Sequence, residues 1–227
     1  MITIIDYGVG NINAFLNVYK KLAIPAKRAT SILDLENSTR LILPGVGSFD
    51  HAMEKFNNSG MRDKVEELVF QNKVPILGIC VGMQMLAKSS TEGHLQGLGW
   101  IDGEVKRFDA GTIPFPTKYP HMGWNNVNPV KETPLFNGLE KDAEFYFLHS
   151  YYFETNNQND VLAVTDYGIK FAASVNHENI FGIQCHPEKS HNWGIQLLKN
   201  FATGIRNIIS ITILKSKSQN QNCSVEN

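Results

Sequence analysis

Short apolar runs rich in β-branched residues recur through the first half of the chain, and each ends in a turn that contains Gly or Pro. These runs are 2–5, 41–43 and 74–79. Strands buried on both faces have this pattern. Between the runs, apolar residues recur at helical spacing, as at Ile12, Phe15 and Tyr19 and again at Val65 and Leu68. Strands that alternate with helices predict a parallel sheet covered on both sides.

The second half of the chain has a different pattern, with Pro, Gly and aromatic residues between shorter strand-like runs. These runs are 104–108, 145–148, 161–165 and 180–185. We expect mixed or antiparallel β structure added to the same sheet. Apolar residues at helical spacing from Gly194 to Ile205 predict a last helix. The fold class is therefore α/β, a three-layer sandwich with a mostly parallel central sheet and extra β structure in the C-terminal half.

The domain organisation follows from chain length and from the last residues. The chain has 227 residues, 42% of them apolar, which is enough for one domain with a substantial core. We place that domain at residues 1–207. Residues 208–227 begin with a short β-prone run and become polar from Lys215, so they bury too little apolar area to offset their ordering entropy. We predict a disordered tail there.

Charge and composition exclude several classes of function. Lys and Arg total 21 against 22 acidic residues, so no net field attracts nucleic acid or an anionic membrane. There is no basic leader with an apolar core at the start of the sequence, and no apolar stretch of membrane-spanning length. We expect a soluble cytoplasmic protein. Cys80, Cys185 and Cys223 are odd in number and lack paired spacing, which argues against a disulfide framework and a structural zinc site.

The strongest local signal for chemistry surrounds Cys80. It lies between Gly78 and Gly82, after an apolar run and before the helical pattern 83–88. This is the nucleophile-elbow arrangement with Cys in place of Ser, in which glycines let the chain turn without Cβ clashes. The helix N-terminus favours the thiolate, and the Val81 N–H points to an oxyanion. The alternative is a cysteine that is simply buried, as free cysteines often are.

A second signal supplies a proton shuttle. His186, Pro187 and Glu188 follow directly after the strand-like run 180–185. Residues two apart in an extended segment point to the same side, so we expect His186 and Glu188 together at the end of the sheet. Glu188 can fix the imidazole tautomer while His186 moves the proton. A surface turn is the alternative, since Pro beside polar residues is common in loops.

A dinucleotide site is a further possibility after the first predicted strand, at Gly8 and Gly10. The fingerprint needs a third glycine at position 13, which is Asn13. We reject this interpretation and expect no cofactor and no metal.

Six motifs distributed over roughly residues 2–201 support a family assignment. They are 6–11, 44–47, 78–84, 121–125, 146–151 and 186–190. Together they resemble the class I glutamine amidotransferases, and within that family the glutaminase subunits of imidazole glycerol phosphate synthase. The Cys and His-Pro-Glu motifs mark the superfamily, whereas the first, second and fourth motifs indicate this type of subunit. The resemblance implies a flavodoxin-like fold and the hydrolysis of L-glutamine to glutamate and ammonia.

The resemblance also implies roles for individual residues. The catalytic residues are Cys80, His186 and Glu188. The oxyanion site is Gly45, Val46, Gly47 and Val81. The substrate-binding residues are Gln84, Glu92, Ser150 and Tyr151, with Glu92 on the α-ammonium. The partner is a (β/α)8-barrel cyclase subunit in a heterodimer that makes imidazole glycerol phosphate in histidine synthesis, and the interface residues around the ammonia exit are Asn11, Tyr146 and Lys189.

Two positions depart from the family pattern, and three other functions remain open. Val81 replaces the more usual Leu, and Cys185 replaces the more usual Phe, which leaves a second thiol near the site. The first alternative keeps the glutaminase but gives ammonia to a surface-sugar amidotransferase partner. The second is a flavodoxin-like binding module without catalysis. The third is a cysteine hydrolase or peptidase, which predicts an acid before the histidine rather than after it at Glu188.

Overall fold

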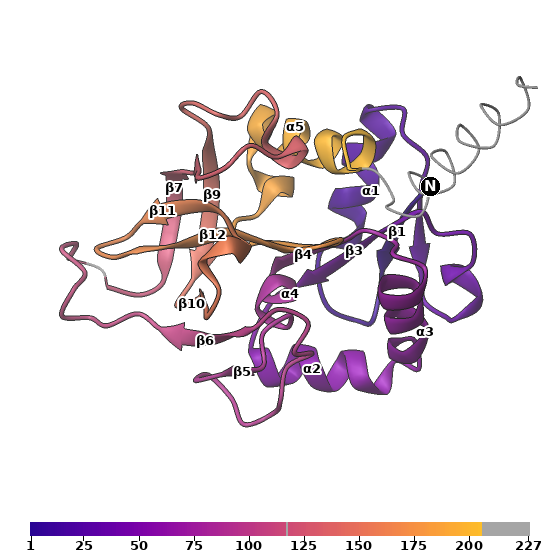
Figure 1. Cartoon of the computed structure of the whole chain (residues 1–227), viewed down its shortest axis with the longest axis horizontal. Coiled ribbons are helices and arrows are strands. Elements are labelled where there is room, and N and C mark those ends of the chain that lie inside the picture. Colours follow the sequence, from indigo (N-terminus) through magenta and orange to yellow (C-terminus); the bar gives the residue numbers. More distant parts are fainter. Residues whose placement is uncertain (117, 206–227) are drawn as a thin grey trace, which may run out of the picture.

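The computed structural model describes residues 1–116 and 118–205, and these residues form one large sheet with helices on both faces and a separate two-stranded ribbon (Figure 1). The strands are β1 (Ile2–Ile5), β2 (Ala26–Ala29), β3 (Arg40–Gly45), β4 (Ile76–Cys80), β5 (Ser89–Ser90), β6 (Gly103–Arg107), β7 (His121–Asn126), β8 (Asn128–Pro129), β9 (Glu144–His149), β10 (Tyr151–Thr155), β11 (Val161–Asp166), β12 (Lys170–His177) and β13 (Ile180–Ile183). The helices are α1 (Ile12–Lys21), α2 (Phe49–Asn58), α3 (Arg62–Glu66), α4 (Val81–Gln84) and α5 (His191–Thr203).

The centre of the sheet is parallel, as predicted. Its order runs β2-β1-β3-β4-β13, and every neighbouring pair in this run is parallel. All residues of β1, β4 and β13 are buried, which explains why these strands have no polar alternation. Gly45 pairs with Cys80, and Ile183 pairs with Ile79. The carboxyl ends of β3, β4 and β13 therefore lie side by side.

Helices cover both faces of this parallel part, which confirms the three-layer arrangement. In Figure 1, α1 and α5 lie on one side of the sheet, and α2 and α3 lie on the other. In α1 the buried side chains are Ile12, Phe15 and Tyr19, at the spacing of one helical face. Tyr19 is fully buried, and its hydroxyl donates to the Leu198 carbonyl of α5. The two helices of this layer are thus joined to each other as well as to the sheet.

The expectation that all the later β structure extends the same sheet is wrong for one strand pair. Strands β10, β12 and β6 do extend it, with antiparallel pairs. The residues 145–148, however, belong to β9, which pairs with β7 in a separate two-stranded ribbon. The other side of β9 is occupied by a loop, because the His186 N–H donates to the Tyr146 carbonyl and Tyr146 N–H donates to Ser190 Oγ. The ribbon is thereby attached to the residues that follow β13.

The predicted helical stretch 83–88 is also wrong in length. Helix α4 has four residues and ends at Gln84. The next carbonyls bond outside the helix, since Met85 O accepts from Leu98 N–H and Leu86 O accepts from Ile101 N–H. These bonds lead the chain toward β5 instead of continuing the helix.

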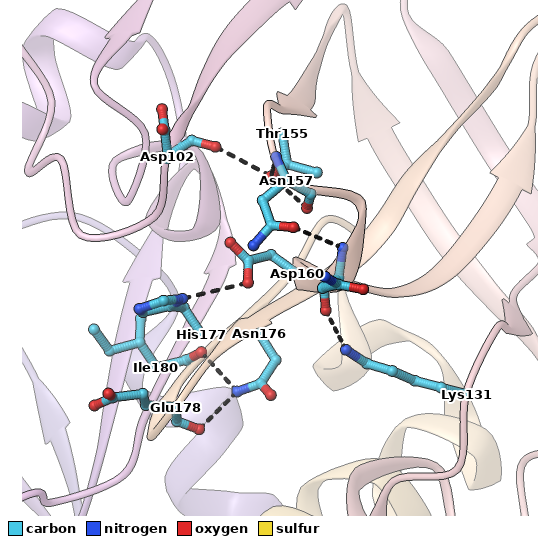
Figure 2. A network of polar contacts seen from close by, with 10 residues as sticks. Asp102, Lys131, Thr155, Asn157, Asp160, Asn176, His177, Glu178 and Ile180 are labelled. Atoms are coloured by element: carbon cyan, nitrogen blue, oxygen red, sulfur yellow. Dashed lines mark hydrogen bonds and ion pairs between the residues drawn. The ribbon is translucent and has the colours of Figure 1, made fainter.

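The loops of the C-terminal half are tied together by a polar network (Figure 2). It joins the turn after β10 to the hairpin between β12 and β13. Asp160 is largely buried, and its Oδ1 lies 3.3 Å from Nδ1 of His177. Asn176 Nδ2 donates to the carbonyls of Glu178 and Ile180, at 2.9 and 3.0 Å. The labelled residues of this network are not among those that line the cavity at Cys80.

The predicted domain boundary and tail fall at the end of the described residues. Ile205 is the last of them and is buried. The tail 208–227 lies outside the described residues, so its disorder stays a prediction. In the part of the chain that the structure describes, no helix is long and apolar enough to cross a membrane.

Candidate active site

Cys80 is the last residue of β4 and immediately precedes α4. Its φ is 56° and its ψ is −113°, so the strained conformation of the elbow falls on the cysteine itself. The two flanking glycines are needed for close approach. A Cβ on Gly82 would lie 1.9 Å from the Leu43 carbonyl oxygen, and one on Gly78 would lie 2.5 Å from the Gly82 oxygen. Steric contact between neighbouring backbones therefore explains the Gly-x-Cys-x-Gly pattern.

His186 and Glu188 lie together, as predicted, but for a different reason. His186 Nδ1 is 2.9 Å from Glu188 Oε1, and the two side chains are 5% and 3% exposed. The segment is not extended, because Pro187–Lys189 forms a 3-10 turn. The turn brings Glu188 back under the imidazole. Nδ1 is bound to the carboxylate, which leaves Nε2 as the ring nitrogen available for Cys80.

The charge on His186 depends on opposing effects. Burial lowers the pKa of His186, but hydrogen bonds and charge interactions with Cys80 and Glu188 outweigh it and raise the pKa to about 10. The imidazole is therefore protonated at neutral pH and can pair with a thiolate. Glu188 Oε2 is buried and has no hydrogen-bond partner among the described residues. The carboxylate thus interacts with the imidazole through one oxygen.

The predicted oxyanion segment lies directly beside the nucleophile. Gly45 pairs with Cys80 across β3 and β4, and a Cβ on Gly45 would lie 2.4 Å from the Gly82 nitrogen. Gly47 has a φ of +84°, a value that glycine adopts readily. Val46 and Gly47 line the same cavity as Cys80 and Val81. Their use as oxyanion donors stays a prediction.

One cavity of about 420 Å³ collects most of the predicted site residues. Its lining includes Val46, Gly47, Cys80, Val81, Gln84, Glu92, Pro120, Leu148, His149, Ser150, Tyr151, His186 and Lys189. All four predicted substrate-binding residues are in this set. Gly45 and Glu188 lie behind the wall, where they contact Cys80 and His186. The volume is in the range of small-molecule sites.

The predicted substrate-binding residues have protein partners as well. Glu92 Oε2 accepts from the N–H of Phe49, the first residue of α2, at 2.8 Å. Gln84 is 2% exposed, and its Nε2 donates to the Tyr151 carbonyl and to Gln184 Oε1, at 3.0 and 3.1 Å. Both hydrogens of this amide are therefore used within the protein. Glu92 keeps a carboxylate at the cavity that suits a cation.

Two of the three predicted interface residues contact each other directly. Lys189 is exposed, lines the cavity and lies over the Tyr146 ring, with Nζ 5.8 Å from the ring centroid. Tyr146 in turn contacts Trp124, at a centroid distance of 6.2 Å. Asn11 is the N-cap of α1, where its side chain accepts from Ala14 N–H, and it lies outside the cavity lining. Lys189 and Tyr146 thus form one contact, and Asn11 begins α1, which packs against the turn Pro187–Lys189.

Sequence reasoning missed three buried groups next to this site, namely His121, His149 and Gln184, and it anticipated a fourth, the Cys185 thiol. His121 Nδ1 lies 3.1 Å from His149 Nε2, and Gln184 Nε2 lies 3.8 Å from Cys80 Sγ. Cys185 is fully buried, and burial, Glu188 and Cys80 all raise its pKa. Both histidines fall within motifs that carried the family resemblance, which was the available signal.

The fold and this cavity define a glutamine amidotransferase. The family model for class-I glutamine amidotransferase matches residues 3–205, and the chain belongs to this family. It is 55% identical over 202 residues to the imidazole glycerol phosphate synthase subunit HisH of Bdellovibrio bacteriovorus, covering 89% of this chain and 99% of that one. It is 50% identical over 203 residues to the subunit of the same name from Leptospira interrogans, with 89% and 100% coverage. The resemblance stated from the motifs is confirmed.

Solved structures agree with this fold. A putative GMP synthase protein from Thermoplasma acidophilum has a TM-score of 0.67 and 22% identity, over 95% of this chain and 96% of that chain. PurLQS from Thermotoga maritima has a TM-score of 0.68 and 14% identity, over 90% and 98%. At these identities the likeness establishes the fold alone, and it agrees with the predicted flavodoxin-like class.

Proposed function

We propose that the chain is the glutaminase subunit of an imidazole glycerol phosphate synthase. It hydrolyses L-glutamine to glutamate and ammonia, and it passes the ammonia to a cyclase subunit in histidine biosynthesis. The observation that carries this proposal is the buried group of Cys80, His186 and Glu188 at one cavity, in a chain 55% identical to a subunit of that enzyme. A binding module without catalysis has no need for an imidazole whose pKa is held at about 10 beside a thiol.

The reaction follows from the charges of these groups. The Cys80 thiolate attacks the amide carbon of glutamine, and a tetrahedral oxyanion forms. Nε2 of His186 gives its proton to the amide nitrogen, the C–N bond breaks and ammonia leaves. The neutral imidazole then removes a proton from water, whose oxygen attacks the glutamyl thioester. Glutamate is released, and His186 and Cys80 regain their starting charges.

Glu188 and the oxyanion segment support these steps. The Glu188 carboxylate fixes Nδ1 as the protonated nitrogen, so that Nε2 is directed to the reaction. The backbone N–H groups of Val81 and of the segment Gly45, Val46 and Gly47 are the candidates to bind the oxyanion. Positive φ at Gly47 indicates a segment that can rearrange when a partner docks.

The cavity has charges that suit an amino acid. Glu92 binds the α-ammonium, and Ser150 and Tyr151 flank the α-carboxylate. Lys189 and Glu92 both line the wall, so opposite charges are present in one cavity. The partner is a (β/α)8-barrel cyclase that forms a heterodimer with this chain. It docks where Val46, Leu148 and Lys189 are exposed at the cavity mouth, and ammonia leaves past Tyr146 and Lys189.

The test is to combine the purified chain with a cyclase subunit of histidine synthesis and to supply glutamine labelled with ¹⁵N in the amide. We expect slow glutamate release by the chain alone, a large increase with the cyclase, and ¹⁵N in the imidazole product. Stimulation by a surface-sugar amidotransferase partner instead would establish the alternative acceptor. A chain that is fully active alone, with no response to either partner, would contradict the proposal and favour a free-standing hydrolase.

A further inference from the structure

Gln184 contacts the nucleophile but has no role in the proposed reaction so far. It follows β13, it is fully buried, and its Nε2 lies 3.8 Å from Cys80 Sγ. We propose that Gln184 is a positioning residue for the nucleophile, whose amide N–H donates to the Cys80 thiolate and holds the sulfur in place. This inference rests on the proposed role of Cys80 as the nucleophile.

The orientation of the Gln184 amide is fixed by its neighbour. Gln184 Oε1 accepts from Gln84 Nε2 at 3.1 Å, and the same Nε2 donates its other hydrogen to the Tyr151 carbonyl at 3.0 Å. An amide turned the other way would place one NH2 group against another and an oxygen against the thiolate. The donor end of Gln184 therefore faces Cys80.

The Tyr151 carbonyl also accepts from a neutral histidine, His149, which is bonded in turn to His121. His149 Nδ1 donates to it at 2.7 Å, and His149 Nε2 accepts from His121 Nδ1 at 3.1 Å. Burial lowers the pKa of His149 to about 3, with the neighbouring His121 adding to this, and burial lowers the pKa of His121 to about 4. Each ring is neutral and so has one donor and one acceptor, which fixes both tautomers. The Tyr151 carbonyl thus accepts from His149 on one side and from Gln84 on the other, and Gln84 in turn orients the Gln184 amide beside the Cys80 sulfur.

The titratable groups around Cys80 differ from the Gln184 amide in how their charge depends on pH. Burial, with Cys80 adding to it, raises the pKa of Tyr7, whose hydroxyl donates to the Pro44 carbonyl. Burial also raises the pKa of Cys185. Both groups stay neutral through the working pH range. The charged groups near the sulfur are His186, with Glu188 behind it, and Lys189 and Glu92, which line the same cavity. Gln184 adds a donor whose charge does not change with pH.

The chemical value of this donor is its selectivity for the charged sulfur. Hydrogen bonds to an ionised acceptor are stronger than those to a neutral one. The contact therefore favours the thiolate over the thiol, and it weakens once the sulfur becomes a neutral thioester. An amide cannot supply the proton, so it does not compete with His186 as the acid. Without Gln184, less of the enzyme holds a thiolate at a given pH.

The test is the pH dependence of Cys80 alkylation by iodoacetamide, followed by peptide mass spectrometry so that Cys185 and Cys223 are distinguished. Gln184→Met keeps the length and burial of the side chain but removes the donor. We expect the pH of half-maximal alkylation to rise by about one unit, as befits the loss of one hydrogen bond to a charged group. Ser174→Ala is the matched control, because it removes a buried hydrogen bond to Gly182 O without touching Cys80. The pH of half-maximal alkylation, the half-point, should be the same in Ser174→Ala as in the wild type.

The outcomes separate the inference from the proposed function. A half-point in Gln184→Met equal to the wild type contradicts the inference. Slower alkylation at every pH with an unchanged half-point also contradicts it, because that is the result of a purely structural role. If circular dichroism shows that Gln184→Met is unfolded, Gln184→Asn replaces it as the test variant. The amide of Gln184→Asn is too short to reach Cys80 Sγ, so it must show the same rise in the pH of half-maximal alkylation. A wild-type Cys80 that reacts as slowly as free cysteine contradicts the proposed function itself.

Discussion

At the scale of single residues, Cys80 has a backbone conformation that non-glycine residues rarely adopt. Such a conformation costs on the order of 1–3 kcal/mol and persists only where the surroundings impose it. Here β4 fixes the chain before it, α4 fixes the chain after it, and the glycines allow the two to meet β3. The imposed conformation places the thiol at the end of β4, beside His186.

The first prediction concerns the two partners of the thiol. His186→Ala removes the group that moves the proton, whereas Glu188→Gln removes only the charge that orients it. We expect kcat for glutamine hydrolysis to fall about 10³-fold or more in the first variant and clearly less in the second. Steady-state kinetics of the partner-activated enzyme would measure both. A larger loss in Glu188→Gln would contradict the assigned roles.

Single residues also show what could and could not be predicted from the sequence. The grouping of Cys80, His186 and Glu188 at one site could be predicted because the signals are local, namely two glycines around Cys80 and the His-Pro-Glu tripeptide. Gln184 could not, because it acts on a residue 104 positions away, and nothing in its neighbourhood indicates that contact. The His121–His149 pair, 28 residues apart, was hidden for the same reason.

At the scale of elements, the close contact of β3, β4 and α4 builds the site. Glycines at 45, 78 and 82 let these backbones approach more closely than any Cβ allows. The Gly-x-Cys-x-Gly pattern predicted the tight turn at Cys80, whereas the contact of this turn with β3 appears only in the structure. The short length of α4 could not, since the carbonyls of Met85 and Leu86 bond to residues in a distant loop. The position of β9 outside the main sheet likewise depends on its bonds to His186 and Ser190.

Gly82→Ala tests this contact. A Cβ at this position would lie 1.9 Å from the Leu43 carbonyl oxygen, so a backbone segment has to move. We expect the free energy of unfolding to fall by about 3 kcal/mol, at the upper end for overpacking, and activity to be lost. Gly111→Ala is the control, because its Cβ would meet only the Asp109 side chain, 3.3 Å away. Equal stability of the two variants in urea unfolding would show that the contact is looser than described.

The β7–β9 ribbon leads to a prediction about pH. The folded pKa values of His121 and His149, about 4 and about 3, lie below the ordinary value of 6.5. The unfolded chain therefore binds protons that the folded chain does not, and stability is lost as pH falls below 6.5, by roughly 1.4 kcal/mol per pH unit for each histidine. His186 has a raised pKa and stays protonated in the folded state, so it slightly opposes the loss near pH 6.5 and adds no slope once the pH is well below 6.5.

Urea unfolding at pH 6.5, 5.8 and 5.0 would measure that slope. His149→Gln removes one of the two titrating groups, and it should reduce the loss of stability between these pH values. His94→Gln, at an exposed histidine, should leave the slope unchanged. A slope in His149→Gln equal to that of the wild type would mean that the buried pair does not control stability in acid.

At the scale of the whole molecule, the site lies where two differently built halves meet. The parallel half brings Cys80 and the oxyanion segment, and the chain after β13 brings His186, Glu188 and the attachment of β9. The parallel half could be predicted well, because alternating strands and helices have few arrangements. The later half could not, because its strand pairs depend on long-range contacts rather than on periodicity. Lys189, in the turn after β13, lies over the ring of Tyr146 on β9 beside this junction.

Lys189→Ala tests the role of this junction in ammonia delivery. An exposed charge contributes under about 1 kcal/mol to association, so we expect a small change in the affinity for the cyclase. We expect a larger loss in the ratio of product formed to glutamate released, because Lys189 lies at the cavity mouth. Lys199→Ala, an exposed lysine on α5, is the matched control and should change neither. An unchanged ratio together with weakened binding would assign Lys189 to docking alone.

The most direct measurement of the central claim compares two nitrogen sources in the complex of Cys80→Ala with its cyclase partner. The account predicts that the glutamine-dependent reaction falls to background, because no thioester forms, while the reaction with added ammonium chloride continues at the wild-type rate. Cys185→Ala, which removes a second buried thiol, should keep both activities. Loss of both activities in Cys80→Ala, or survival of the glutamine-dependent reaction, would contradict the account.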